Sequence, residues 1–234
     1  NIHPTYKMVD TCAGEFVAKT AYYYSSWSGE HDVEVASTKK KIIIIGSGPI
    51  RIGQGIEFDY CSVHGVLALK QQNYEAILIN NNPETVSTDY EIADRLYFEP
   101  LTTEDVLNII ELEKADGVIV QLGGQTAISL VKNLEDAGVP LLGTNHETID
   151  KLEDRDLFYQ FMQEINVPHI PGVTAYDEVD LLRKAEQIGF PVLIRPSYVI
   201  GGQGMMIFQT SQEIIDYIND ELSSIMFPIL LDAF

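Results

Sequence analysis

The sequence predicts an α/β protein with a parallel sheet, followed by a second region of different plan. Apolar, β-branched runs such as KIIIIG, which begins at Lys41, are typical of strands buried on both faces. Helical segments alternate with these runs, as they do in parallel strand–helix–strand units. After Gly143 this alternation gives way to helices, a strand, a Gly-rich turn and another strand.

In chain order, residues 1–27 are aromatic and turn-rich without a regular period, and the polar stretch 28–40 is typical of a linker. From Lys41 onward the hydrophobic pattern predicts strands at KIIIIG, EAILIN, DGVIVQL and VPLLG. Helices are expected at about 55–72, over TEDVLNIIELEKA and over QTAISLVKNLEDAG, where Gly138 marks the C-terminal end.

The second region begins near residues 144–150 with two short helices that reach Val167. An amphipathic helix, YDEVDLLRKAEQIG, then leads into the strand FPVLIRP, the Gly-rich turn, the helix SQEIIDYINDEL and the strand FPILLDAF. Because the chain stops on this apolar strand, we expect a piece of a larger protein. We also expect the strand to lack neighbours, so that the C-terminal region is loose or associates with itself through an open edge.

Composition excludes several classes of protein. The net charge is −20, from 15 basic and 35 acidic residues. This balance argues against nucleic-acid binding, which depends on clustered Lys and Arg. Cys12 and Cys61 are lone thiols without metal-ligand spacing, as expected in a reducing compartment. No apolar stretch approaches the roughly 20 residues of a membrane span and no signal peptide is visible, so we expect a cytoplasmic protein without a membrane partner.

The segment 190–208, FPVLIRPSYVIGGQGMMIF, is the strongest candidate for a ligand site. A strand ends on Arg195, at the mouth of a turn that contains Gly201, Gly202 and Gly204. Glycines let the backbone approach an anion, and guanidinium matches phosphate oxygens well. The pattern indicates a hairpin that covers phosphates. The alternative is an ordinary Gly-rich hairpin with a surface arginine.

The first glycine loop, GSGPIRIGQG, suggests a dinucleotide-binding turn, but two features disfavour it. Its spacing is GxGxxxxGxG, and the second strand ends in Asn80–Asn82, where such proteins place an acidic ribose ligand. Glu57 and Glu84 follow the strand ends, where open α/β sheets bind ligands, although helix capping or solvation explains them equally well. The turn QLGGQTA is likewise compatible with ligand contact or tight-turn geometry.

Arg155 lies early in a helix among the acidic residues Glu153, Asp154 and Asp156. It is either a surface ion pair with a residue four positions away or a second phosphate-binding cation. From the residues alone the surface pair is favoured.

Taken together, the motifs resemble the large subunit of carbamoyl-phosphate synthetase, in that family's order and over nearly the whole chain. The segments that carry the resemblance are NIHPTYKMVDTCAGEF, GSGPIRIGQGIEFDY, INNNPETVSTDY, QLGGQTA, DKLEDRDLF and IRPSYVIGGQGM. They are similar to the second half of that subunit. The resemblance implies the tail of an oligomerisation region at 1–38, a Rossmann-like pre-ATP-grasp domain at 39–147, and the beginning of an ATP-grasp domain at 148–234.

The resemblance also implies a function. The family makes carbamoyl phosphate from bicarbonate, glutamine-derived ammonia and two ATP, for arginine and pyrimidine synthesis, and its second half phosphorylates carbamate. By this resemblance Arg155 and Arg195 bind nucleotide phosphates, with Arg195 acting on the transferring phosphoryl group. The remaining implied site residues are Gly201 and Gly202 in the phosphate-covering loop, and Gly55, Glu57 and Glu84 in the passage for carbamate.

The cofactor and partners follow from the same resemblance. The Mg²⁺ or Mn²⁺ ligands of the family lie beyond Phe234, so no metal ligand is expected here and the chain alone should be inactive. Expected partners are the glutamine amidotransferase small subunit, the rest of the large subunit and small-molecule substrates; homo-oligomerisation is left open. The alternatives are a biotin carboxylase-like ligase, which normally carries Lys in place of Arg195, an NAD-binding oxidoreductase and a non-catalytic scaffold.

Overall fold

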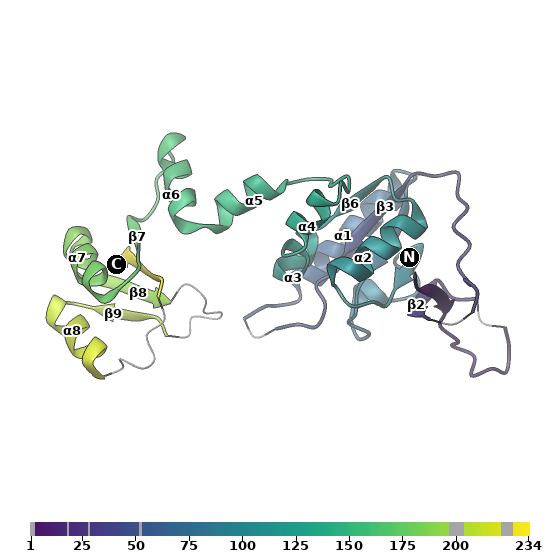
Figure 1. The fold of residues 1–234 in the computed structure, drawn as a ribbon, viewed down its shortest axis with the longest axis horizontal. Helices are drawn as coiled ribbons and strands as arrows, with labels where there is room; N and C mark the ends of the chain where they lie inside the picture. Colours follow the sequence, from purple (N-terminus) through teal and green to yellow (C-terminus); the bar gives the residue numbers. More distant parts are fainter. Residues whose placement is uncertain (1–2, 18, 28, 52, 197–203, 221–226) are drawn as a thin grey trace. The chain divides into compact units, whose positions relative to one another are not determined.

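A computed structural model describes residues 3–17, 19–27, 29–51, 53–196, 204–220 and 227–234. The chain divides into two compact units, Asn1–His146 and Glu147–Phe234 (Figure 1). Each contains its own sheet, and the two are described separately below. No helix in the described part of the chain combines the length and apolar character needed to cross a membrane.

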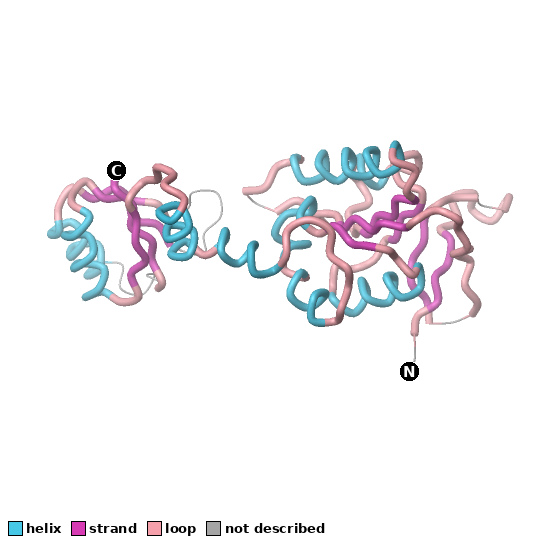
Figure 2. The backbone as a smooth tube through the Cα atoms, turned by 90° about the horizontal axis from the view of Figure 1, so that it is seen from above, coloured by secondary structure: helices cyan, strands magenta, loops and turns pink. Residues whose placement is uncertain are grey.

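The first unit is built on a six-stranded sheet in the order β1-β2-β5-β4-β3-β6. All neighbouring strands are parallel except β1 and β2. Every residue of β3 and β4 is buried, which confirms the expected parallel α/β sheet with a core on both faces. Figure 2 shows helices on both sides of these strands. The strands are β1 Thr5–Met8, β2 Tyr22–Ser26, β3 Lys41–Ile45, β4 Glu75–Ile79, β5 Arg95–Tyr97 and β6 Gly117–Ile119.

The helices of this unit follow the predicted alternation with two differences. The segment QTAISLVKNLEDAG forms two short helices instead of one, and VPLLG contributes a single bridge between Leu141 and Val118. Gly138, at φ +77°, follows the last helix in the left-handed conformation expected of a C-terminal glycine. The helices are α1 Glu57–Gln71, α2 Thr103–Glu113, α3 Gly124–Ile128 and α4 Val131–Asp136, with 3₁₀ turns η1 Val86–Thr88 and η2 Gln121–Gly123.

The N-terminal segment corrects the expectation of irregular structure. β2 pairs in parallel with β5, so Tyr22 lies opposite Leu96, and β1 adds an antiparallel edge. Tyr6 packs edge-on against Tyr97 with ring centroids 5.2 Å apart. Because Leu96 and Tyr97 lie more than 70 residues away from their partners Tyr22 and Tyr6, local periodicity does not reveal these contacts. Strands from within residues 1–38 therefore belong to the same sheet as strands from 39–147.

A buried network of charged side chains lies at the edge of this sheet where β3, β4 and β5 begin. Lys41 Nζ and Arg95 Nη1 each lie 2.7 Å from Glu113 Oε2, and Arg95 Nη1 also lies 2.7 Å from Glu75 Oε1. The Tyr97 hydroxyl donates to the other oxygen of Glu113. These charges are mutually paired at the edge opposite the glycine loops, and we assign them to structure.

The second unit is a four-stranded antiparallel sheet in the order β7-β10-β8-β9. One face packs against α7 and α8 through a core that includes Leu181, Ile194, Ile214 and Leu231. The strands are β7 Gly172–Ala175, β8 Val192–Pro196, β9 Met206–Phe208 and β10 Ile229–Ala233. The helices are α5 His146–Glu153, α6 Arg155–Glu164, α7 Glu178–Ile188 and α8 Ser211–Asp220 (Figure 1).

The final strand was expected to lack neighbours, and this prediction is wrong. β10 pairs with β7 on one side and with β8 on the other. Leu231 at its middle is completely buried. The apolar pattern predicted the strand correctly, but its partners are set by antiparallel pairing with segments far upstream. β10 is therefore one of the two inner strands of the sheet, with β8 as the other.

Candidate functional site

The face of the second sheet turned away from α7 and α8 brings together the side chains of the candidate site. In the strand register, Arg195 of β8 lies opposite Leu230 of β10, two residues before Asp232. Directly opposed residues, and residues two apart along a strand, share one face of a sheet. The alternate residues, such as Ile194 and Leu231, form the core against α7 and α8. Arg195 and Asp232 therefore share the face turned away from that core.

Asp232 joins Arg195 to Tyr159 of α6. Arg195 Nη2 lies 2.7 Å from Asp232 Oδ2, and the Tyr159 hydroxyl donates to Asp232 Oδ1 over 2.7 Å. The Asp232 side chain is 8% exposed and that of Arg195 is 24% exposed. Arg195 Nε is buried and has no hydrogen-bond partner among the described residues. The site thus contains a largely buried, paired carboxylate and a guanidinium with unused donor capacity.

Gly172 of β7 makes room for this arrangement. A Cβ atom at Gly172 would lie 2.3 Å from Asp232 Oδ1 and 2.6 Å from the Tyr159 hydroxyl. Both distances are far shorter than van der Waals contact. The glycine is therefore required by close approach and not by its backbone conformation.

The pKa of Tyr159 is affected by its burial, by Asp232 and by both predicted cations. Burial, followed by the hydrogen bond to Asp232, raises the pKa of Tyr159 to about 12. The positive charges of Arg155 and Arg195 both act in the opposite direction on this pKa. Tyr159 therefore remains a protonated donor at neutral pH, and the two predicted cations both act on its hydroxyl.

Arg155 is the first residue of α6 and follows its N-cap, Asp154, whose side chain accepts the Leu157 N–H at 2.9 Å. Arg155 is exposed, and within the described residues it forms no ion pair. The surface pair favoured by the residues alone is therefore not formed there. Its guanidinium remains available to an anionic ligand.

The predicted hairpin is present, since β8 and β9 pair antiparallel with Val192 opposite Phe208. Gly201 and Gly202, predicted to cover phosphates, lie outside the described residues. Gly204 adopts φ +73°, a left-handed conformation that favours glycine.

In the first unit, the glycine loop and the asparagine segment meet at the carboxyl edge of β3 and β4. Asn80 is completely buried, accepts the Gly48 N–H at 3.0 Å and donates to Ser87 Oγ at 3.3 Å. A Cβ atom at Gly46 would lie 2.6 Å from the Asn80 side chain. Asn80 therefore ties the loop to the sheet at the place where a dinucleotide binder has its ribose ligand, which disfavours that alternative further.

The three residues predicted for a carbamate passage also follow these strands. Gly55 N–H donates to Glu57 Oε1 at 3.2 Å, and Glu57 begins α1. Glu84 is exposed, and its N–H donates to Asn82 Oδ1 at 3.1 Å. The carboxylate of Glu57 thus serves the turn at the start of the helix, whereas that of Glu84 forms no hydrogen bond or ion pair with the described residues.

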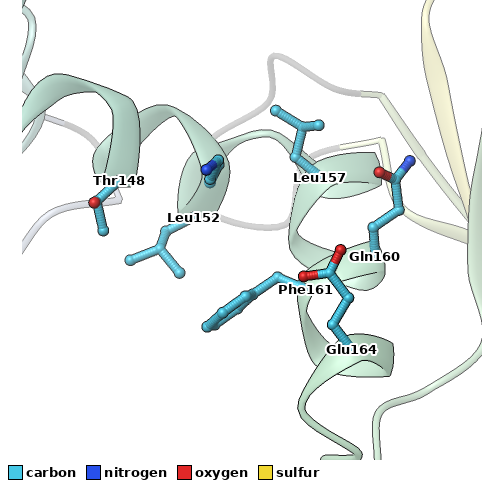
Figure 3. A pocket seen from close by; sticks show the side chains of 7 residues that line it. Thr148, Leu152, Leu157, Gln160, Phe161 and Glu164 are labelled. Atoms are coloured by element: carbon cyan, nitrogen blue, oxygen red, sulfur yellow. The ribbon is translucent and has the colours of Figure 1, made fainter.

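The described residues of the second unit also enclose a cavity of about 420 Å³ in the bend between α5 and α6. Figure 3 shows Leu152 from α5 and Phe161 from α6 facing this space. Neither Arg155 nor Arg195 lines it, so this cavity is not the predicted site. No three His, Cys, Asp or Glu side chains cluster in the described part of the chain in a way that fits a metal ion.

Sequence reasoning missed Asp232, Tyr159 and Gly172. Asp232 carries a signal in retrospect, because an acidic residue inside the apolar strand ILLDA must be paired if it is buried. Tyr159 and Gly172 carry no such signal, since their roles depend on contacts between α6, β7 and β10.

Comparison with protein families agrees with this architecture. Residues 38–151 match the carbamoyl phosphate synthase preATP-grasp domain. Residues 154–228 match the carbamoyl-phosphate synthase L chain, ATP binding domain. The first match covers most of the first unit, from residue 38 onward, and the second match covers most of the second unit.

Curated relatives share high identity over the full chain. The chain is 64% identical over 232 residues to the carbamoyl phosphate synthase arginine-specific large chain of Halalkalibacterium halodurans, covering 99% of this chain and 22% of that protein. It is 56% identical over 243 residues to the carbamoyl phosphate synthase large chain, C-terminal section, of Methanocaldococcus jannaschii, covering 39% of that protein. The chain thus spans well under half the length of these relatives.

Among solved structures, the biotin carboxylase domain of Hydrogenobacter thermophilus 2-oxoglutarate carboxylase is similar with a TM-score of 0.60. The identity is 21%, over 85% of this chain and 45% of that one, and this likeness shows the fold alone. The much higher identity to synthase relatives, together with the two matched domains, decides between the ligase families. The chain belongs to the carbamoyl phosphate synthase large chain family.

Proposed function

We propose that this chain is part of an ATP-dependent, glutamine-hydrolysing carbamoyl phosphate synthase and contributes to the phosphorylation of carbamate. It spans 22% of the length of its arginine-specific relative, so the activity belongs to the whole large chain. The domain assignment follows the family: 39–147 as the pre-ATP-grasp domain, 148–234 as the start of the ATP-grasp domain and 1–38 as the tail of an oligomerisation region. Arginine and pyrimidine synthesis are the proposed destinations of the product.

The proposal depends mainly on Arg195, whose guanidinium has a hydrogen-bond donor without a partner among the described residues. Arg195 lies within the segment matched by the ATP binding domain, on the face of the second sheet turned away from α7 and α8, with Nε unpaired among the described residues. Arg155 acts on the same Tyr159 hydroxyl and forms no ion pair within the described residues. Two guanidinium groups with free donors in the same unit suit the oxygens of a nucleotide phosphate chain.

In the proposed reaction, a carbamate oxygen attacks the γ-phosphorus of ATP. The new O–P bond forms as the bond from that phosphorus to the bridging oxygen of ADP breaks, which yields carbamoyl phosphate and ADP. The negative charge is spread over the phosphoryl oxygens in the transition state. Arg195 would stabilise that charge, Arg155 would hold the nucleotide, and the loop with Gly201 and Gly202 would cover its phosphates.

Gly55, Glu57 and Glu84 are the residues we propose for a carbamate passage. Gly55 and Glu57 follow β3 and Glu84 follows β4, at the ends of parallel strands where open α/β sheets bind ligands. The Gly55–Glu57 hydrogen bond fixes the loop, and the exposed Glu84 supplies an uncommitted polar group.

Other components are proposed from the family. The similar biotin carboxylase domain of Hydrogenobacter thermophilus was solved in complex with MgADP, ADP and bicarbonate. We assign Mg²⁺ or Mn²⁺ to the reaction through residues of the large chain outside this segment. The glutamine amidotransferase small subunit and the remainder of the large chain are the proposed partners. A cytoplasmic location fits the two free cysteines.

The test is ATP formation from ADP and carbamoyl phosphate, catalysed by the full-length large chain that contains this segment. We expect Arg195→Ala to lower the rate by about 10²- to 10³-fold, as loss of a transition-state donor does in other enzymes. Arg183→Ala is the matched control, because Arg183 is exposed and pairs with Asp180 on α7. No ATP formation by a folded parent that binds ADP, or equal rates for the two variants, would reject the proposed role.

A further inference from the structure

We propose that Asp232 and Tyr159 are positioning residues for Arg195. One oxygen of the Asp232 carboxylate pairs with one nitrogen of the guanidinium. The Tyr159 hydroxyl occupies the other oxygen, so that a second nitrogen of Arg195 cannot pair with it. The remaining N–H groups of Arg195 are thereby left for the phosphate. This inference rests on the proposed function, because Arg195 must first be shown to act on the nucleotide.

Asp232 is itself held in place by strand pairing and by contacts to both of its carboxylate oxygens. It belongs to β10, which is paired on both sides, by β7 and by β8. Its side chain is largely buried, and both of its oxygens have partners. A long arginine side chain loses conformational freedom when it binds such an anchor. Asp232 therefore reduces the number of positions that the Arg195 guanidinium can occupy.

The Asp232 carboxylate is shared between Arg195 and Tyr159. Arginine and carboxylate groups often form two parallel hydrogen bonds, which use both oxygens and two guanidinium nitrogens. Here Tyr159 occupies Oδ1 at 2.7 Å, and only Oδ2 pairs with Arg195, through Nη2. Nε is buried and lacks a partner in the described part of the chain. A purely structural ion pair would be expected to satisfy that donor as well.

The residues around the ion pair also leave space for the hydrogen bond between Tyr159 and Asp232. Gly172 leaves the space that the Tyr159–Asp232 hydrogen bond fills, since a Cβ atom would meet both groups below 3 Å. Tyr159 comes from α6, whose first residue is Arg155. α6 thus supplies both Arg155, a proposed phosphate ligand, and the Tyr159 hydroxyl, which limits how Arg195 pairs with Asp232.

The experiment is a double-mutant cycle in the full-length large chain, followed by ATP formation from ADP and carbamoyl phosphate. Asp232→Asn keeps the shape of the side chain but removes its charge. We expect a loss of roughly 10- to 100-fold when Arg195 is present. In the Arg195→Ala background the same change should cause little further loss. Asp180→Asn is the control, because Asp180 also pairs with an arginine, Arg183, but both residues belong to α7 and have no role in the proposed site.

Equal losses from Asp232→Asn in both backgrounds would overturn the proposal, because Asp232 would then act independently of Arg195. Tighter ADP binding by Asp232→Asn would also overturn it, since the carboxylate would then compete with the phosphate. If Arg195→Ala itself has no effect, the proposed function fails, and this result is distinct from either outcome.

Tyr159→Phe gives a second test that removes one hydroxyl and leaves both charges in place. With Oδ1 released, Asp232 can pair with two nitrogens of Arg195. We expect a lower kcat and a higher KM for ADP, by about 10-fold in kcat/KM. Unchanged kcat and KM in a folded variant would show that the hydroxyl has only a structural role and would reject the positioning role of Tyr159.

Discussion

At the scale of single residues, Tyr159 offers a direct test of its buried hydrogen bond. Its pKa is raised to about 12, first by burial and then by its bond to Asp232. Because the folded pKa lies above the unfolded one, the contribution to stability is complete below about pH 10 and is lost as the pH rises toward 12. Burial also raises the pKa values of Tyr6 and Tyr97, so spectrophotometric titration should show several late-titrating tyrosines, and Tyr159→Phe should have one fewer, titrating near pH 12. Equal numbers of late-titrating tyrosines in the two proteins would contradict the hydrogen bond.

Gly172→Ala tests the space beside this bond. The added Cβ would lie 2.3 Å from Asp232 Oδ1 and 2.6 Å from the Tyr159 hydroxyl. Because one of these groups must move, we expect a loss of about 1–3 kcal/mol in the free energy of unfolding, measured by urea denaturation. Gly138→Ala is the control for steric contact, since nothing lies within 4 Å of a Cβ there, although its positive φ carries its own cost. Equal stability of Gly172→Ala and the wild type would show that the site relaxes freely.

At the scale of elements, the pairing of β10 with both β7 and β8 can be tested by truncating a side chain in the middle of this strand. Leu231 is completely buried between the helices and the sheet. Leu231→Ala should therefore cost about 2–5 kcal/mol of unfolding free energy, as truncation of core leucines does. Ile207→Ala on the edge strand β9, where the side chain is 43% exposed, should cost clearly less. Similar small losses at both positions would support a loose C-terminal strand instead.

The charge network at the beginning of β3, β4 and β5 provides a second element-scale prediction. Glu113 is buried and neutralises Lys41 and Arg95, each at 2.7 Å. Glu113→Gln leaves two buried cations short of a partner, so we expect a loss of about 3–5 kcal/mol in thermal or chemical unfolding. Glu147→Gln, which breaks the exposed pair with Lys151, should change stability too little to measure. Comparable effects of the two variants would mean that water reaches the Glu113 network.

At the scale of the whole molecule, the net charge of −20 should make stability depend on salt. Repulsion between like charges opposes compaction, and added salt screens it. We expect the melting temperature at pH 7 to rise between low and moderate NaCl concentrations. The rise should shrink near pH 4.4, the isoelectric point calculated from the sequence. A fall in melting temperature with salt at pH 7 would show that ion pairs outweigh the net repulsion.

Most of the helices and strands, and the family, could be predicted from the amino-acid sequence. The apolar run at Lys41–Ile45, the alternating helices and the strand ending near Arg195 were predicted from local pattern, and the motifs identified the large-chain family. These features are local, because periodicity and glycine spacing are properties of short segments.

Which segments contact one another could be learned from the three-dimensional structure alone. It placed the N-terminal strands beside β5 and the final strand between β7 and β8. It also brought Tyr159, Arg195 and Asp232 together from α6, β8 and β10. Such contacts depend on strand register and on the packing of residues 36–73 positions apart, which no local pattern encodes. For this reason the cation of the candidate site could be predicted from the sequence, whereas the carboxylate and hydroxyl that hold it could not.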